Sequence, residues 1–246
     1  MLTTPEMALL LDRNRQRAAA HITTQADSAV LRECQDAAAR AGIWLHIGSM
    51  PLRDEASDKS VNRAFLIAPD GAIAAHYDKI HLFDVELATG ESWMESRAYQ
   101  AGSRAVLVDT PLGRIGLAIC YDLRFPALFD ALGAARPDLI LSPAAFTVPT
   151  GEAHWHLLTR ARAVESGCFL IAAAQVGQHE DGRATYGHSV AVGPWGDVLL
   201  DMGHAPGLAF VDLDFAENAK VRGQIPGLGN RRDIAPPVII NAMGSA

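Results

Sequence analysis

The sequence lacks the features that mark membrane-spanning, secreted and nucleic-acid-binding proteins. No apolar run reaches the roughly 18 residues of a membrane-spanning helix, and no basic start precedes an apolar stretch typical of a secretory signal. The 21 basic residues are scattered among 28 acidic ones, and the formal net charge is −7. A basic patch for nucleic acid or an anionic membrane is therefore absent from the pattern. We expect neither a membrane nor a nucleic acid as a partner.

Cysteine is also scarce. The chain has 3 cysteines, Cys34, Cys120 and Cys168, an odd number without the spacing of a disulfide framework or a zinc site. Such a pattern is typical of a reduced, cytoplasmic protein with free thiols. It predicts no metal site.

Apolar residues make up 49% of the 246 residues, enough to bury the core of a single large α/β domain spanning 1–246. The pattern predicts a helix over 29–41 that ends at Gly42, and hairpins over 62–77 and 106–119. Alternating helices and hairpins favour a mixed sheet. The tail after about residue 234 is expected to be an arm or a frayed end. The remaining predicted elements are strands 43–49, 138–142, 169–175, 187–192, 198–200 and 208–213 and helices 125–135 and 153–166.

The most informative segment is Gly113–Pro126. Its apolar run, Ile115 to Ile119, ends abruptly at Cys120, and a polar, aromatic and basic cluster follows. Such a run is typical of a buried strand, and ligands bind at the carboxyl ends of strands in open α/β sheets. A thiol there, beside backbone N–H groups that turn into a helix, is placed to act as a nucleophile. The alternative is a small buried hydrophobe, the usual role of a free cysteine.

Two further segments extend this pattern. Glu6 follows Pro5, and Lys79 stands in Tyr-Asp-Lys-Ile-His-Leu-Phe-Asp. The order Glu6, Lys79, Cys120 resembles the signature of the nitrilase superfamily of carbon–nitrogen hydrolases. The resemblance runs from residue 2 to about residue 234, through the motifs at 142–146, 154–155, 160–165, 186–189 and 194–196. It implies a four-layer α-β-β-α sandwich with two mixed sheets, assembled as homodimers or higher homo-oligomers.

The beginning of the chain differs from the resemblance. Members of the superfamily usually carry a strand and a helix before this Pro-Glu pair, and here the chain begins at Met1. A misassigned start, a fragment and a true truncation all remain open, and the position of Met1 inside the usual strand favours the first. Loss of a neighbouring strand leaves backbone groups unpaired, so we expect an upstream-extended chain to be more stable.

The resemblance implies a cofactor-free mechanism. Cys120 attacks an amide carbon and forms a thioester, while Glu6 acts first as base and then as acid toward the departing ammonia. A free thiol and a free glutamate differ by about 4 pKa units, or about 6 kcal/mol, so the site must reduce this gap. Lys79 can lower the pKa of the thiol and, with the N–H of Tyr121, bind the oxyanion.

A second glutamate is also implied. By resemblance Glu95 orients the lysine or the substrate amide, and Glu91 competes for this role. For either residue the alternative is a solvated loop charge. Tyr121, Arg124 and Phe146 are the candidate substrate-binding residues, and Arg124 is either an anchor for a substrate carboxylate or a structural ion-pair partner.

Within the superfamily, the combination of motifs resembles the branch that hydrolyses the amide of deaminated glutathione. The alternatives are ω-amidases acting on 2-oxoglutaramate-type substrates and N-carbamoyl hydrolases. Two alternatives come from different classes: a catalytically silent binding or assembly member of the superfamily, and a redox-sensing cysteine protein. His154 and His156 flank Trp155 on opposite sides of a helix, which suits neither joint metal ligation nor a catalytic pair, and His188 is expected to hydrogen-bond at a strand end.

Overall fold

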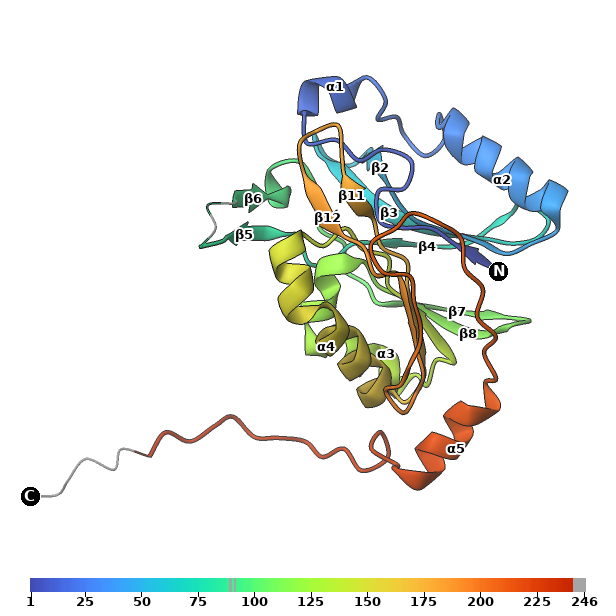
Figure 1. The fold of residues 1–246 in the computed structure, drawn as a ribbon, viewed down its shortest axis with the longest axis vertical. Coiled ribbons are helices and arrows are strands. Elements are labelled where there is room, and N and C mark those ends of the chain that lie inside the picture. Colours follow the sequence, from blue (N-terminus) through green and yellow to red (C-terminus); the bar gives the residue numbers. More distant parts are fainter. Residues whose placement is uncertain (89, 91, 241–246) are drawn as a thin grey trace, which may run out of the picture.

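A computed structural model describes residues 1–88, 90 and 92–240, which are built around two mixed β-sheets (Figure 1). The first sheet has the strand order β1-β2-β3-β4, with β1 parallel to β2 and the other neighbours antiparallel. The second has the order β14-β13-β10-β9-β8-β7, in which only the β8–β9 and β9–β10 pairs are parallel. Their bounds are β1 Leu2–Thr3, β2 Leu45–Arg53, β3 Ser60–Ile67, β4 Ile73–Asp78, β7 Val106–Thr110, β8 Gly113–Leu117, β9 Leu139–Leu141, β10 Phe169–Ala172, β13 Val190–Val192 and β14 Val198–Asp201.

Strand β3 shows how the two sheets become a sandwich. Side chains alternate across a strand, and here both faces are apolar. Ala64 and Leu66 belong to the core shared with the second sheet, whereas Phe65 and Ile67 pack in the outer core with helix α2 (Ala29–Ala41). The first sheet is therefore covered on one face by the second sheet and on the other by a helix.

The other outer layer is formed by α3 (Pro126–Ala134) and α4 (Val148–Ser166), which pack against the second sheet (Figure 1). The four-layer α-β-β-α order and the two mixed sheets are confirmed. The predicted helix 29–41 is also confirmed: the Ser28 side chain accepts from Leu31 N–H, and Gly42 ends it with φ of 63°. The short helix α1 (Arg15–Ala19) lies near the first sheet. Helix α5 (Ala216–Gln224) is the last helix along the described chain.

Several elements differ from prediction. Helix α4 begins at Val148 instead of residue 153 because Pro149 fits the first turn of a helix. The strand predicted over 208–213 is wrong: no strand is found there, and Leu208 and Phe210 are 67% and 86% exposed. Apolar alternation alone cannot form a strand without a backbone partner. Two small hairpins were not predicted, β5 (Asp84–Glu86) with β6 (Ser92–Met94) and β11 (Val176–Gln178) with β12 (Ala184–Tyr186).

The segment after α5 has no helix or strand up to residue 240, and its residues 231–240 are exposed. Figure 1 shows it extending away from the layers. Among the residues described here, no helix is both long and apolar enough to span a membrane.

Candidate active site

Glu6 is held at the edge of the first sheet by a segment that crosses close to β2. After β1, Thr4 N–H donates to His46 O at 3.0 Å. Gly48 permits the crossing, since a Cβ there would lie 2.0 Å from Thr4 O. The backbone oxygen of Glu6 accepts from Gln175 Nε2 at 3.0 Å. Glu6 is therefore buried and fixed on both its backbone and its side chain.

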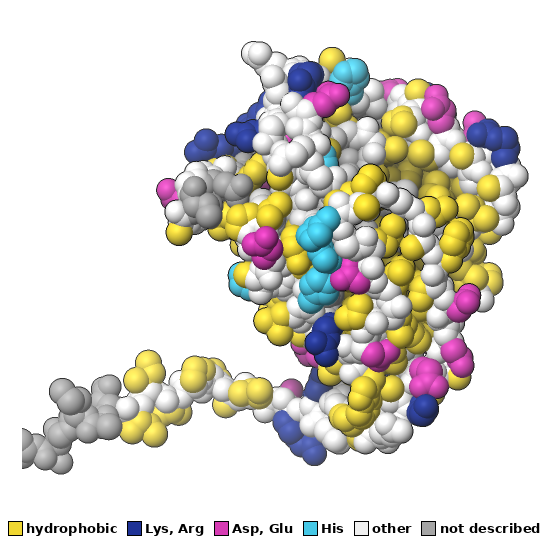
Figure 2. All heavy atoms as spheres, viewed as in Figure 1, with side chains coloured by type: hydrophobic (Ala, Val, Ile, Leu, Met, Phe, Trp, Pro, Cys, Tyr) yellow, Lys and Arg dark blue, Asp and Glu magenta, His cyan; other side chains and the backbone are white. Residues whose placement is uncertain are grey.

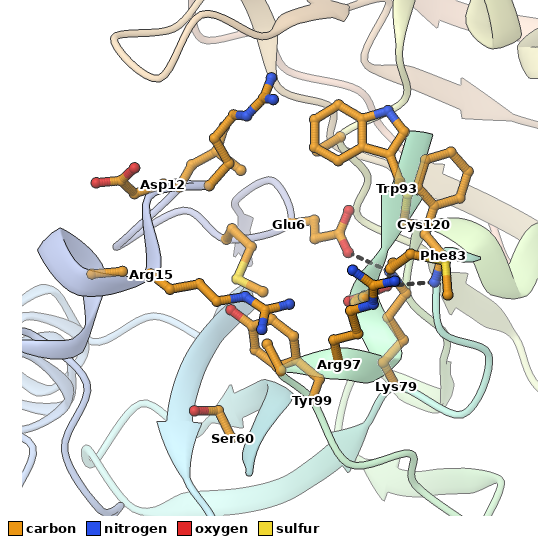
Figure 3. Close-up of a pocket in the computed structure, with 18 of the residues that line it drawn as sticks. Glu6, Asp12, Arg15, Ser60, Lys79, Phe83, Trp93, Arg97, Tyr99 and Cys120 are labelled. Carbon is orange, nitrogen blue, oxygen red and sulfur yellow. Dashed lines mark hydrogen bonds and ion pairs between the residues drawn. The ribbon is translucent and has the colours of Figure 1, made fainter. Parts of the chain in front are cut away.

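Lys79 follows β4 directly and lies between two carboxylates. Its Nζ is 2.8 Å from Glu6 Oε1 and 2.9 Å from Glu95 Oε2 (Figure 3). Glu95 begins a 3-10 turn, Glu95–Arg97, and its Oε2 also accepts from Phe83 N–H at 2.6 Å. The structure thus brings Glu6, Lys79 and Glu95 together. Glu91, the alternative second glutamate, lies outside the described residues.

Cys120 comes from the second sheet. Strand β8 ends at Leu117, and Cys120 opens a 3-10 turn with φ of 49°, a left-handed conformation that is strained for any residue except glycine. Its N–H donates to Pro143 O at 2.8 Å. Its thiol lies near the Ala145 backbone and the Glu6 carboxylate, both of which act on the pKa of the thiol. Strain at this position is of the kind that clusters at functional sites.

Burial and charge set the protonation of the site. Burial raises the pKa of the Cys120 thiol well above its ordinary value, and the Glu6 charge raises it further. Lys79 lowers the pKa of the thiol, as expected, but is outweighed. Burial lowers the pKa of Lys79, but the charges of Glu6 and Glu95 outweigh this effect and the pKa is raised. A charged lysine and a protonated thiol follow, so thiolate formation requires a base in direct contact.

Asn62 is a site residue that sequence reasoning missed. Its Nδ2 donates to Glu6 Oε1 at 3.0 Å and to Glu95 Oε1 at 3.2 Å. Its backbone oxygen accepts from Lys79 N–H at 3.0 Å. One buried residue of β3 therefore orients both carboxylates through its side chain and holds the backbone of Lys79. A single asparagine inside a strand carries no recognisable signal, so only the fold reveals it.

Asp122 is a second missed residue, and it fixes the turn that carries Cys120. This fully buried carboxylate accepts from Ile119 N–H at 2.8 Å and from the Tyr77 hydroxyl at 2.7 Å. It also accepts from His81 N–H at 3.0 Å and contacts His81 Nδ1 at 2.7 Å. The two sheets are thereby joined beside the thiol, because Tyr77 and His81 flank Lys79 in sequence.

A cavity of about 480 Å³ opens onto these groups. Glu6, Lys79, Glu95 and Cys120 belong to its lining, and Glu6, Lys79 and Cys120 are buried. These four residues are called the floor below; Figure 3 shows three of them, Glu6, Lys79 and Cys120. This volume falls within the range of small-molecule sites, about 300–1,000 Å³. The predicted substrate-binding residues Tyr121, Arg124 and Phe146 also line the cavity.

Arg124 is placed against aromatic rings. Its guanidinium lies 5.3 Å from the Phe146 ring centroid and 5.9 Å from that of Tyr121, and Nη1 is 3.3 Å from His154 Nδ1. Among the residues that the structure describes, no carboxylate forms an ion pair with Arg124. The structural ion-pair interpretation therefore finds no support there.

Basic side chains gather around the outer part of the cavity. Arg15 and Arg97 extend their guanidinium groups into it (Figure 3). These two residues and Arg124 are called the mouth below. Basic residues outnumber acidic ones along the lining although the chain as a whole is acidic. The cavity is therefore suited to a negatively charged small molecule. The other basic residues of the lining are Arg13, Lys59, Lys79 and Arg183.

The arrangement of the floor supports acyl transfer through a thiol. A carboxylate near the thiol can take its proton, and an ammonium near both can stabilise negative charge on a substrate oxygen. Tyr121 follows Cys120 directly in the chain, and its backbone N–H is the second candidate donor to that oxygen. Of the predicted residues, Glu6, Lys79, Glu95 and Cys120 thus meet in one place.

Comparison with known sequences agrees with this geometry. The sequence model of the carbon-nitrogen hydrolase family matches residues 1–222. A relative from Yersinia enterocolitica named deaminated glutathione amidase is 40% identical over 237 residues, covering 96% of this chain and 82% of the relative. A human protein of the same name is 39% identical over 216 residues, covering 86% of this chain and 66% of that protein.

Solved structures show the same fold. The NitFhit protein of C. elegans has a TM-score of 0.84 and 36% identity, covering 94% of this chain and 56% of that one. A mutant amidase from Nesterenkonia sp. AN1 has a TM-score of 0.77 and 28% identity, covering 94% of this chain and 80% of that one. That amidase holds the acetamide moiety of fluoroacetamide covalently on its active-site cysteine. With its fold, its grouped Glu, Lys and Cys and these relatives, this chain belongs to the carbon–nitrogen hydrolase family.

Proposed function

We propose that the protein is an amidase that hydrolyses small linear amides through a thioester on Cys120, with deaminated glutathione as the preferred substrate. The observation that carries this proposal is a buried thiol in the same cavity lining as Glu6, whose ion-pair partner Lys79 also pairs with Glu95. The names of the relatives support the choice of substrate.

The first half of the reaction uses Glu6 as base and then as acid. Glu6 takes the proton of the Cys120 thiol while Sγ attacks the amide carbon. Lys79 Nζ and the Tyr121 N–H stabilise the oxyanion. Glu6 then delivers the proton to the leaving nitrogen, the C–N bond breaks, and an amine and a thioester are formed. Because Lys79 keeps its charge against two carboxylates, it serves as an electrostatic group and not as a second base.

The second half returns the site to its starting state. Glu6 takes a proton from a water molecule, and the hydroxide attacks the thioester carbon. The C–S bond breaks, the free acid leaves, and the proton passes back to Sγ. Throughout the reaction Glu95 holds Lys79 in place and compensates the charge of Lys79. Both oxygens of Glu95 are engaged, by Lys79, Asn62 and Phe83 N–H.

The leaving group depends on the substrate. Deaminated glutathione is a secondary amide, so its hydrolysis releases the amine of cysteinylglycine together with 2-oxoglutarate. Ammonia, the product expected from sequence, would come only from primary amides. The close alternative substrate, 2-oxoglutaramate, is such a primary amide and has the same acyl half. Both would form the same 2-oxoglutaryl thioester, and they differ only in the part that leaves.

Charge at the mouth supports an acidic substrate. Deaminated glutathione carries one carboxylate on its keto-acid end and another on its glycine end. We propose that Arg124, four residues after the nucleophile, binds the keto-acid carboxylate. We propose that Arg15 and Arg97 bind the carboxylate of the leaving half. A charge-assisted hydrogen bond to a carboxylate contributes about 1.5–3 kcal/mol.

A single assay tests the proposal. Release of 2-oxoglutarate is measured from deaminated glutathione and from 2-oxoglutaramate, and ammonia is measured from an N-carbamoyl amino acid and from a neutral amide. We expect the highest kcat/KM with deaminated glutathione and no turnover by Cys120→Ala. A higher kcat/KM with 2-oxoglutaramate would make the protein an ω-amidase. Absence of turnover with every amide, in a folded protein, would support the silent binding member instead.

A further inference from the structure

Away from the cavity, three histidines and one aspartate meet at the surface. His156 lies in α4, His188 precedes β13, Asp201 ends β14, and His204 follows it. His156 Nε2 is 2.9 Å from Asp201 Oδ2, and His188 Nδ1 is 2.8 Å from Asp201 Oδ1. His188 Nε2 is 3.1 Å from His204 Nε2. Figure 2 shows histidine side chains gathered on the face turned to the viewer.

With all of these histidines neutral, the hydrogen bonds of the cluster cannot all be formed, and one additional positive charge is needed between His188 and Asp201. His204 Nδ1 faces the Tyr186 carbonyl at 3.3 Å, and a carbonyl only accepts, so Nδ1 carries the hydrogen. In a neutral ring His204 Nε2 is then an acceptor, and His188 Nε2 must donate to it. A neutral His188 therefore presents the lone pair of Nδ1 to the Asp201 carboxylate, and two acceptors meet at hydrogen-bond distance. An ion between them removes this conflict.

We propose that His156 Nε2, His188 Nδ1 and one oxygen of Asp201 bind a divalent transition-metal ion, for which zinc fits best. The three ligand atoms lie within 4.8 Å of one another. Atoms bound to tetrahedral zinc at about 2.0–2.1 Å lie roughly 3.3 Å apart. Small side-chain shifts therefore suffice. Two imidazoles and one carboxylate are ligands typical of zinc, whereas calcium and magnesium prefer oxygen.

The surroundings hold the ligands in position. His204 is the outer partner that keeps the hydrogen of His188 on Nε2 and so frees Nδ1, an arrangement usual for metal-bound histidine. Asp201 Oδ1 accepts from Gly203 N–H at 2.9 Å. The Tyr186 ring stacks on His188 at a centroid distance of 4.5 Å. His188 itself has φ of 55°, a strained conformation that directs its ring toward Asp201.

The ion would connect α4 to the ends of two strands of the second sheet. Asp201 and His156 are 31% and 35% exposed as side chains, so the remaining coordination position is open to water or to a ligand. Binding to the folded state alone raises stability with metal concentration. Neither the cavity nor Cys120 takes part, and the site is independent of the proposed amidase reaction.

The test measures zinc binding by calorimetry to the full chain without a polyhistidine tag, in a Cys120→Ala background that removes the reactive thiol. We expect one equivalent of zinc to bind and the melting temperature to rise with zinc. Asp201→Asn and His156→Ala should each weaken binding by at least about 10- to 100-fold, and His204→Ala by about that factor. His21→Ala, which changes an exposed histidine outside the cluster, is the matched control and should bind zinc normally.

The outcomes are separable. Circular dichroism checks that each variant is folded, and Asp201→Asn keeps the shape of the side chain if His156→Ala does not fold. Failure of the Cys120→Ala protein to bind zinc or cobalt overturns the proposal, and a proton then supplies the additional charge. Zinc binding that is as tight in Asp201→Asn and His204→Ala as in the parent overturns it as well, because the ion would then sit elsewhere.

Discussion

The floor and the mouth of the cavity are built in opposite ways. On the floor, Glu6 and Lys79 are 4% and 2% exposed, and every charged group there has at least two polar partners. At the mouth, Arg15 and Arg97 are exposed. The floor is therefore fixed before substrate arrives, whereas the mouth is free to adapt to it. Rate should depend on the floor, and substrate choice on the mouth.

The floor is organised for reaction and not for stability. Burying charged groups costs several kcal/mol for each ion, and here two carboxylates share one ammonium. Removing Lys79 would leave both carboxylates buried without a counter-charge. Variants that keep charge and volume are therefore the informative ones on the floor, whereas truncation to alanine is acceptable at the exposed mouth.

Cys120→Ala should have the largest effect and abolish turnover with every amide, because no thioester can form. The measurement is 2-oxoglutarate release at saturating deaminated glutathione. Cys34→Ala and Cys168→Ala are the controls and should keep most of the activity, since Cys34 lies in α2 and Cys168 is buried in the core next to β10. Residual turnover in Cys120→Ala would exclude the covalent mechanism.

Lys79→Arg should reduce kcat by about 100- to 1,000-fold, the usual loss when one oxyanion donor is removed. Arginine keeps the charge between Glu6 and Glu95 but is planar and longer, so it cannot occupy the same position. The melting temperature should change little, because the charge between the two carboxylates is kept. Near-normal kcat in the arginine variant would show that Lys79 does not contact the oxyanion.

The sequence revealed the groups of the floor that react, but not those that position them. Glu6, Lys79, Glu95 and Cys120 lie in motifs that can be read along the chain, and the structure places them together. Asn62 acts through a contact with two residues from distant segments, so nothing near it in sequence indicates the role.

The same reason explains the other differences. Gly48 matters because another segment crosses it, and the cluster of His156, His188, Asp201 and His204 exists only after α4 and β14 have packed. Helix 29–41 was predictable because its periodicity and caps are local. The strand expected over 208–213 failed because pairing is not local.

Asn62→Ala should reduce kcat by on the order of 100-fold with little change in KM. The amide makes two hydrogen bonds to charged groups, each contributing about 1.5–3 kcal/mol, and part of this is recovered by solvent or by rearrangement. Single-turnover measurements should show slower thioester formation. An increase in KM without a loss of kcat would place Asn62 in substrate binding and not in the positioning of the floor.

Variants of the mouth should have the smallest effects and should change KM rather than kcat. Arg97→Ala should raise KM for deaminated glutathione by about 10-fold, the low end for a charge-assisted bond, because solvent screens an exposed guanidinium. KM for 2-oxoglutaramate should remain unchanged, since that substrate lacks the leaving half. Equal increases for both substrates would place Arg97 at the acyl half.

Arg124→Ala tests the part of the mouth that lies over the rings of Tyr121 and Phe146, in the same cavity as the nucleophile. It should raise KM by about 10-fold for deaminated glutathione and for 2-oxoglutaramate alike, since both share the keto-acid carboxylate. A neutral amide should be hydrolysed as before, and the melting temperature should stay constant. If the neutral amide loses activity in parallel and the melting temperature falls, Arg124 supports the aromatic wall of the cavity, and the carboxylate is bound elsewhere at the mouth.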